Sequence, residues 1–170
     1  MPDLGIVGRA NSPARLAGMA RADDVTPAAL RQKPSWLISQ TSVHSHRLLT
    51  DALGAANARG YQYRLLAALR EFGPASQVAL GRHASLDRSD VVAAVDELVD
   101  LGFVERSADP VDRRRNIIRI TPAGRAQFRR LDKILANVQE ELLSPLSATQ
   151  RQQLVQMLTR VLDHHTNASS

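Results

Sequence analysis

The chain has 170 residues, of which 44% are hydrophobic, and its net charge at pH 7 is +5. This length suits one domain with a packed core, and the absence of cysteine excludes disulfides and thiolate zinc sites. The basic balance favours an anionic partner. Because no apolar run approaches the roughly 20 residues of a membrane span and the N-terminus has no hydrophobic signal core, we expect a cytoplasmic protein without a membrane partner.

The N-terminal third predicts an arm followed by a long helix. Residues 1–33 are expected to form the arm, in which Thr26 resembles a helix cap before a short extra helix. Pro34 ends that short helix and begins a long one, which reaches about Ala58 before Gly60 breaks it.

The middle of the chain predicts three shorter helices. The first runs over about 61–72 and ends at a Gly-Pro pair, and the second covers 76–84. Asp87 is the expected cap of the third, which runs to Leu101 and stops at Gly102. The last two helices form a helix-turn-helix candidate, although its turn lacks the glycine often found there.

A cationic hairpin follows these helices. Two strand candidates, Phe103–Val104 and Ile117–Ile120, flank a polar tip with three consecutive arginines. Residues 102–130 hold eight arginines against three acidic residues, which equals the net charge of the whole chain. A hairpin of this kind can place guanidinium groups against phosphates or in a DNA groove. The alternative is a solvated helix face with a loop.

The last third predicts two helices with apolar faces. Pro145 separates them, and Ser147 with Gln150 forms a capping box at the start of the second. Apolar residues on the first are spaced 3, 4, 3, 4, a seam that implies a partner helix and hence a homodimer. Packing within one chain is the alternative. The interface residues predicted on the two helices are Phe128, Leu131, Leu135, Val138, Leu142, Leu154, Leu158 and Val161.

Together these elements predict a mainly α fold with a small β-wing. The winged helix-turn-helix lobe is expected at 60–121, and the helical dimerisation region at 34–59 and 122–165, with a tail at 166–170.

The chain resembles the MarR family of transcriptional regulators from about Ser35 to His165. The resemblance rests on Leu101-Gly-Phe-Val-Glu-Arg, on Asp109-Pro-x-Asp-Arg-Arg, and on Ile120-Thr-Pro-Ala-Gly. It implies a homodimer without a cofactor that binds a pseudo-palindromic operator in double-stranded DNA, most often as a repressor.

The resemblance also implies roles for the wing residues. Arg114 would enter the minor groove, Asp112 would support the wing, and Arg113 and Arg115 would contact phosphates.

The second helix of the helix-turn-helix candidate, which would contact the DNA bases, offers fewer polar side chains than the wing. Arg88, Ser89 and Asp90 lie at its N-terminal end, where side chains reach base edges. Asp90 is equally suited to complete the helix cap. Ser76 and Gln77, at the start of the preceding helix, are candidate phosphate contacts.

An extra N-terminal helix and a lone Trp resemble the subgroup that responds to urate or similar metabolites. The corresponding effector would be a small anionic or aromatic molecule, because buried anions need a paired cation. The candidate ligand residues are Trp36, His44, Arg47, Tyr63, Arg64, Arg106 and Arg119. In the alternative, Trp36 covers the core and the arginines pair with nearby acids.

The sequence contains no catalytic constellation and no metal site. His44 and His46 are two residues apart and do not share a helix face. Two alternatives to an operator-specific regulator stay open: an architectural DNA binder with little sequence preference, and a helical interaction protein without DNA contact.

Overall fold

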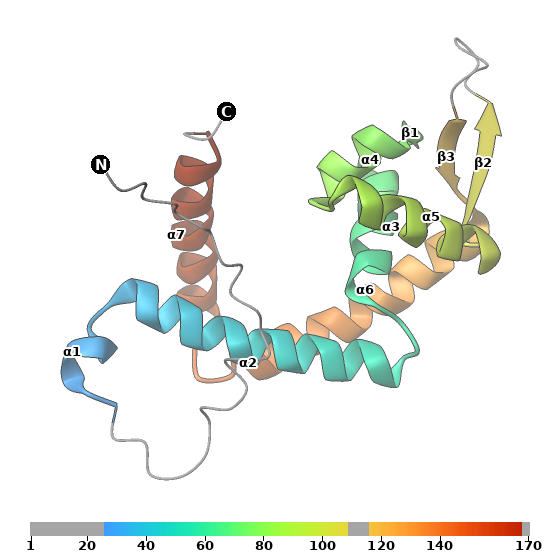
Figure 1. The fold of residues 1–170 in the computed structure, drawn as a ribbon. Coiled ribbons are helices and arrows are strands. Elements are labelled where there is room, and N and C mark those ends of the chain that lie inside the picture. Colours follow the sequence, from blue (N-terminus) through green and yellow to red (C-terminus); the bar gives the residue numbers. More distant parts are fainter. Residues whose placement is uncertain (1–25, 109–115, 168–170) are drawn as a thin grey trace, which may run out of the picture. The chain divides into compact units, whose positions relative to one another are not determined.

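The structure, a computed structural model, describes residues 26–108 and 116–167. The chain divides between Arg47 and Leu48 into two units, and each is described by itself. In chain order the elements are α1 (Ala28–Arg31), α2 (Pro34–Ala55), α3 (Gly60–Phe72), β1 (Ala75–Ser76), α4 (Gln77–Ala84), α5 (Arg88–Asp100), β2 (Val104–Ala108), β3 (Asn116–Ile120), α6 (Pro122–Leu142) and α7 (Ala148–Asn167) (Figure 1). The predicted fold class, mainly helical with a small β-wing, is confirmed.

The ends of the first two helices differ from the prediction. Pro27 itself is the N-cap residue of α1 and no side chain caps the helix, so the predicted Thr26 cap is wrong. Helix α2 ends at Ala55, three residues before the predicted Ala58. It ends there because Asn57 adopts a left-handed backbone conformation, with φ of 52°, which an α-helix cannot contain.

The wing is a three-stranded antiparallel sheet in the order β1-β3-β2. Strand β1 was not predicted, and its two residues pair with Ile117 and Ile118 of β3. Strand β2 starts one residue later than predicted and extends to Ala108, which faces Asn116 across the hairpin.

The main core lies where α3, α4, α5 and the sheet meet. Its fully buried side chains include Leu65, Leu66, Leu80, Leu98 and Ile118. Helix α6 adds Phe128, whose ring stacks on Tyr63 with centroids 5.3 Å apart. The first turns of α6 therefore belong to the same core as the helix-turn-helix.

The chain itself buries part of the seam that was predicted to be a dimer interface. Phe128 lies in the main core, and Leu131 packs with Leu53 and Ala58 in a second cluster that Leu135 partly covers. Val138 is buried as well. These three buried side chains are not available to a partner, so intrachain packing accounts for this part of the seam.

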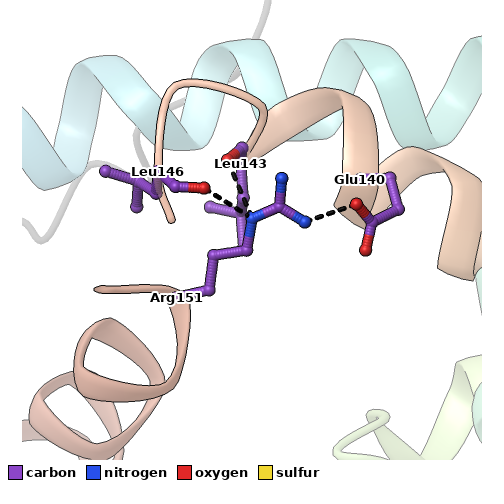
Figure 2. A network of polar contacts seen from close by, with 4 residues as sticks. All are labelled: Glu140, Leu143, Leu146 and Arg151. Carbon is purple, nitrogen blue, oxygen red and sulfur yellow. Dashed lines mark hydrogen bonds and ion pairs between the residues drawn. The ribbon is translucent and has the colours of Figure 1, made fainter. Parts of the chain in front are cut away.

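A polar network closes the turn between α6 and α7 (Figure 2). The Arg151 Nε donates to the carbonyls of Leu143 and Leu146 at 3.1 and 3.0 Å, and its guanidinium pairs with Glu140. The predicted capping box is confirmed: the Ser147 amide donates to Gln150 Oε1 at 2.8 Å, and the Gln150 amide donates to Ser147 Oγ at 3.4 Å. The start of α7 is thus fixed by side chains.

Helix α7 has an apolar face that is largely exposed. None of its residues is buried. Leu158, Val161 and Leu162 are 43%, 51% and 66% exposed. Helical spacing puts these three on one side, with Leu154 one turn earlier. No helix in the described residues is long and apolar enough to cross a membrane.

Candidate nucleic-acid interface

Helices α4 and α5 approach each other closely at the helix-turn-helix. A Cβ atom on Gly81 would lie 2.9 Å from Val91 Cγ2 and 3.3 Å from the Leu86 carbonyl oxygen, so any larger residue there would displace Val91. The glycine missing from the turn is replaced by Ser85, which adopts the left-handed conformation with φ of 51° and ψ of 51°. A non-glycine residue therefore makes this turn at some cost in backbone strain.

The N-terminal end of α5 presents its polar side chains to solvent. Arg88, Ser89 and Asp90 are all exposed. Asp87 is the N-cap residue, but its side chain makes no cap hydrogen bond. Within the described residues the Asp90 carboxylate accepts no hydrogen bond either. The first turn thus carries a guanidinium, a hydroxyl and a carboxylate for which the described part of the chain provides no partner.

The residues that follow on α5 divide between solvent and core. Val92 is 44% exposed and Ala93 is also exposed, whereas Ala94 is buried. The outward face after the first turn therefore offers apolar groups, which contact thymine methyls rather than hydrogen-bonding to bases.

Hydrogen bonds from α3 to the Glu97 carboxylate attach the middle of α5 to α3. The Gln62 Nε2 donates to Glu97 Oε1 at 2.8 Å, and the Tyr61 hydroxyl donates to the other carboxylate oxygen. The hydrogen bond from Tyr61 holds the pKa of Glu97 below its ordinary value, against the opposing effect of partial burial. Burial, and next the bond to Glu97, raise the pKa of Tyr61. Both shifts favour the neutral phenol donating to the carboxylate.

Two arginines add further contacts around α5. Arg106 on β2 pairs with Asp96, and the Arg64 Nη1 donates to the Ser85 carbonyl in the helix-turn-helix turn at 3.2 Å. Sequence reasoning did not identify Tyr61, Asp96 or Glu97. Their only signal was a set of polar residues at helical spacings beside apolar core positions.

The two predicted phosphate contacts, Ser76 and Gln77, lie at the start of α4. Ser76 is the N-cap residue, and its Oγ accepts from the Ala79 amide at 3.3 Å. The hydroxyl proton remains a donor. Gln77 is half-buried in the first turn.

The predicted wing-tip residues Asp112, Arg113, Arg114 and Arg115 lie outside the described residues. The strands that lead into and out of this segment are described, and their last pair is Ala108 with Asn116.

The predicted ligand residues of the second unit do not converge on one site. Arg106 faces Ile118 in the sheet register and lies on the core side, whereas Arg119 faces Glu105 and lies on the opposite side. The Tyr63 hydroxyl donates to Asp132 of α6 at 2.8 Å. Burial, with this bond, raises the pKa of Tyr63 to about 12. Arg106 and Arg119 therefore lie on opposite sides of the sheet, because neighbouring strand positions alternate in direction.

The remaining ligand candidates belong to the first unit. Trp36 is half-buried, and His44 and Arg47 are exposed on α2. Across the described residues, no cluster of three or more His, Asp or Glu side chains could hold a metal ion.

Comparisons with known proteins agree with this geometry. A sequence model of the MarR family matches residues 57–115, which include the helix-turn-helix and β2 of the wing. The HTH-type transcriptional repressor NicR from Pseudomonas putida is 30% identical over 107 residues, covering 63% of this chain and 68% of NicR.

Solved structures also share the fold. A mutant of MarR from E. coli complexed with operator DNA gives a TM-score of 0.67 at 25% identity, covering 81% of this chain and 99% of that one. The PcaV regulator from Streptomyces coelicolor in complex with its natural ligand gives 0.66 at 29% identity, covering 85% and 98%. These are DNA-binding transcriptional regulators rather than enzymes, and the chain belongs to their family, the MarR family of winged helix-turn-helix transcriptional regulators.

Proposed function

We propose that this protein is a homodimeric repressor that binds a pseudo-palindromic operator in double-stranded DNA. The observation that carries the proposal is the exposed first turn of α5, with Arg88, Ser89 and Asp90, on a helix held by Glu97 and Asp96. A side chain reads base edges well only when its helix is held rigidly. The similar MarR structure contains operator DNA, and NicR is named as a repressor.

The wing supplies the second DNA contact. Arg114 enters the minor groove, Asp112 supports the wing, and Arg113 and Arg115 contact phosphates. At the start of α4, Gln77 and the hydroxyl group of Ser76 contact the DNA backbone. These contacts add sequence-independent affinity, while the first turn of α5 supplies the sequence preference.

The dimer is proposed to form through the helical ends of the chain. The exposed face of α7 is the support, since an uncovered apolar stripe of this kind marks a protein interface. Leu154, Leu158 and Val161 contribute from α7, and Leu135 and Leu142 from α6. Two winged lobes then meet half-sites about one DNA turn apart.

A small anionic or aromatic effector is proposed to change the DNA affinity. The PcaV structure, which contains that protein's natural ligand, supports this. Such a molecule acts only through a difference in its affinity for the two dimer geometries. Trp36, His44 and Arg47 stay candidates for contacting it.

The test is the salt dependence of operator binding. An operator is selected from random duplexes by binding, and the affinity of the full chain is measured from low to moderate salt. Arg114→Ala is expected to weaken binding about tenfold and to reduce the slope of log affinity against log salt by about 1. Arg160→Ala, which removes the same charge from α7, is the control and leaves both unchanged.

The other results identify the alternatives. Equal affinity for selected and random duplexes would indicate an architectural DNA binder. No salt-dependent binding to any duplex would indicate a protein-interaction role.

A further inference from the structure

A hollow of about 350 Å³ lies beside the wing sheet. Residues from the end of α3, from β2 and β3, and from the start of α6 line it. Its lining includes Leu69, Arg70, Glu105, Arg119, Ile120 and Arg125. We call it the arginine hollow. None of the contacts described for the helix-turn-helix uses it.

Each of the three guanidinium groups is oriented by a neutral partner. The Arg119 Nε donates to Ser107 Oγ at 3.3 Å, and the Arg125 Nη1 donates to the Ile120 carbonyl at 3.0 Å. The Arg70 guanidinium carbon lies 4.8 Å from the centroid of the Phe128 ring. A guanidinium has five N–H donors, so each group keeps donors free while its position is set.

No carboxylate pairs with these arginines among the described residues. Among the described residues that line the hollow, Glu105 is the only acidic one. It lies directly opposite Arg119 in the sheet register, yet no ion pair joins the two side chains. With three arginines and one glutamate, the hollow carries a net charge of two positive units. Concentrating like charges in one place without a counter-ion is unfavourable, so the arrangement suits a doubly charged anion.

The size and walls of the hollow select among anions. A volume near 350 Å³ lies within the range of small-molecule sites and greatly exceeds what a single phosphate fills. Leu69 and Ile120 supply apolar wall between the charged groups. A carbon skeleton that separates two anionic groups meets both features.

We propose that the arginine hollow binds a small organic dianion, most simply a dicarboxylate. The effect of this dianion on DNA binding depends on the effector response proposed above. The site itself is independent of that response and is tested without DNA.

The experiment is calorimetric titration of the full chain with isophthalate, benzoate and inorganic phosphate. Isophthalate is expected to bind at least about fivefold more tightly than benzoate or phosphate. Arg119→Gln is expected to weaken isophthalate binding about tenfold. Glu105→Gln is expected to strengthen it about threefold, because it removes the one opposing charge. Arg160→Gln, with the same charge change on α7, is the control and leaves the affinity unchanged.

The opposite signs for Arg119→Gln and Glu105→Gln make the assignment specific. Circular dichroism melts show whether each variant folds. If Arg119→Gln does not, Arg125→Lys replaces it and is expected to weaken binding, because lysine lacks the bidentate fork. No isophthalate binding, equal binding of phosphate, or an equal loss in Arg160→Gln would overturn the assignment.

Operator binding by the same proteins is measured separately. A chain that binds isophthalate but no DNA would refute the proposed function and leave the arginine hollow standing. A chain that binds operator but not isophthalate would refute the dianion site and leave the proposed function standing.

Discussion

The carbonyl oxygen of Phe103 lies 2.0 Å from the position that a Cβ atom on Gly124 would occupy. The same corner is joined by Thr121, whose Oγ1 donates to the Gly102 carbonyl at 2.7 Å and accepts from the Gly124 amide at 3.0 Å. The start of α6 is therefore pressed against the backbone that leads into β2. This contact explains why the Thr-Pro-x-Gly motif follows the wing.

Gly124→Ala is expected to lower the free energy of unfolding by about 3 kcal/mol, because a backbone atom cannot move aside as a side chain can. Urea unfolding measures the change. Gly54→Ala is the matched control, since nothing lies within 4 Å of that Cβ position in α2. It should stabilise the chain by about 0.5 kcal/mol through helix propensity. Equal effects of the two substitutions would contradict the close contact.

Ser85→Gly is expected to raise the free energy of unfolding by about 1 kcal/mol. Ser85 is left-handed, and glycine adopts that conformation without the steric cost. The bond that Ser85 accepts from Arg64 uses the backbone carbonyl and is retained. Asn57→Gly provides the comparison, because asparagine tolerates its φ of 52° and should gain less. A loss of stability in Ser85→Gly would show that the hydroxyl is needed.

Because Glu97 accepts hydrogen bonds from α3, we expect the free energy of unfolding to fall at acidic pH. The folded-state pKa of Glu97 lies below its ordinary 4.5, so its contribution is complete above that value and is lost as pH falls through the lowered pKa. Glu97→Gln should therefore flatten the fall in unfolding free energy as the pH drops below the ordinary value of 4.5 and through the lowered pKa. The measurement is urea unfolding at each pH. Asp100→Asn on the same helix, where the described residues show no partner for the carboxylate, should keep the wild-type slope.

Local chain signals were sufficient to predict most of the elements. Apolar spacing with proline and glycine positions placed the five longer helices within a few residues, and the arginine-tipped hairpin identified the wing. The capping box at Ser147 was predicted from two residues and is confirmed.

Features that depend on distant partners were not predictable in this way. Strand β1 has two residues and exists because β3 pairs with it. The heptad spacing around Phe128 shows that a partner must cover the seam, but not that α3 of the same chain does so.

The side of the sheet on which each ligand candidate lies was not predictable for the same reason. Which side of the sheet Arg106 and Arg119 face depends on the register between β2 and β3, which residue counts within one strand do not reveal. The arginine hollow likewise joins residues from α3, β2, β3 and α6 that only the folded chain brings together.

A single charged residue placed on the exposed face of α7 tests the proposed dimer. Leu158→Asp would bury an unpaired carboxylate at the interface, which should weaken dimerisation about a hundredfold or more. Sedimentation equilibrium measures the dissociation constant. Gln156→Asp introduces the same charge nearly opposite on the helix, since two residues are separated by about 200° around the axis. It should leave the dimer intact. Because no α7 residue is buried in the single chain, Leu158→Asp should not unfold the monomer, and a Leu158→Asp protein that remains dimeric would place the interface elsewhere.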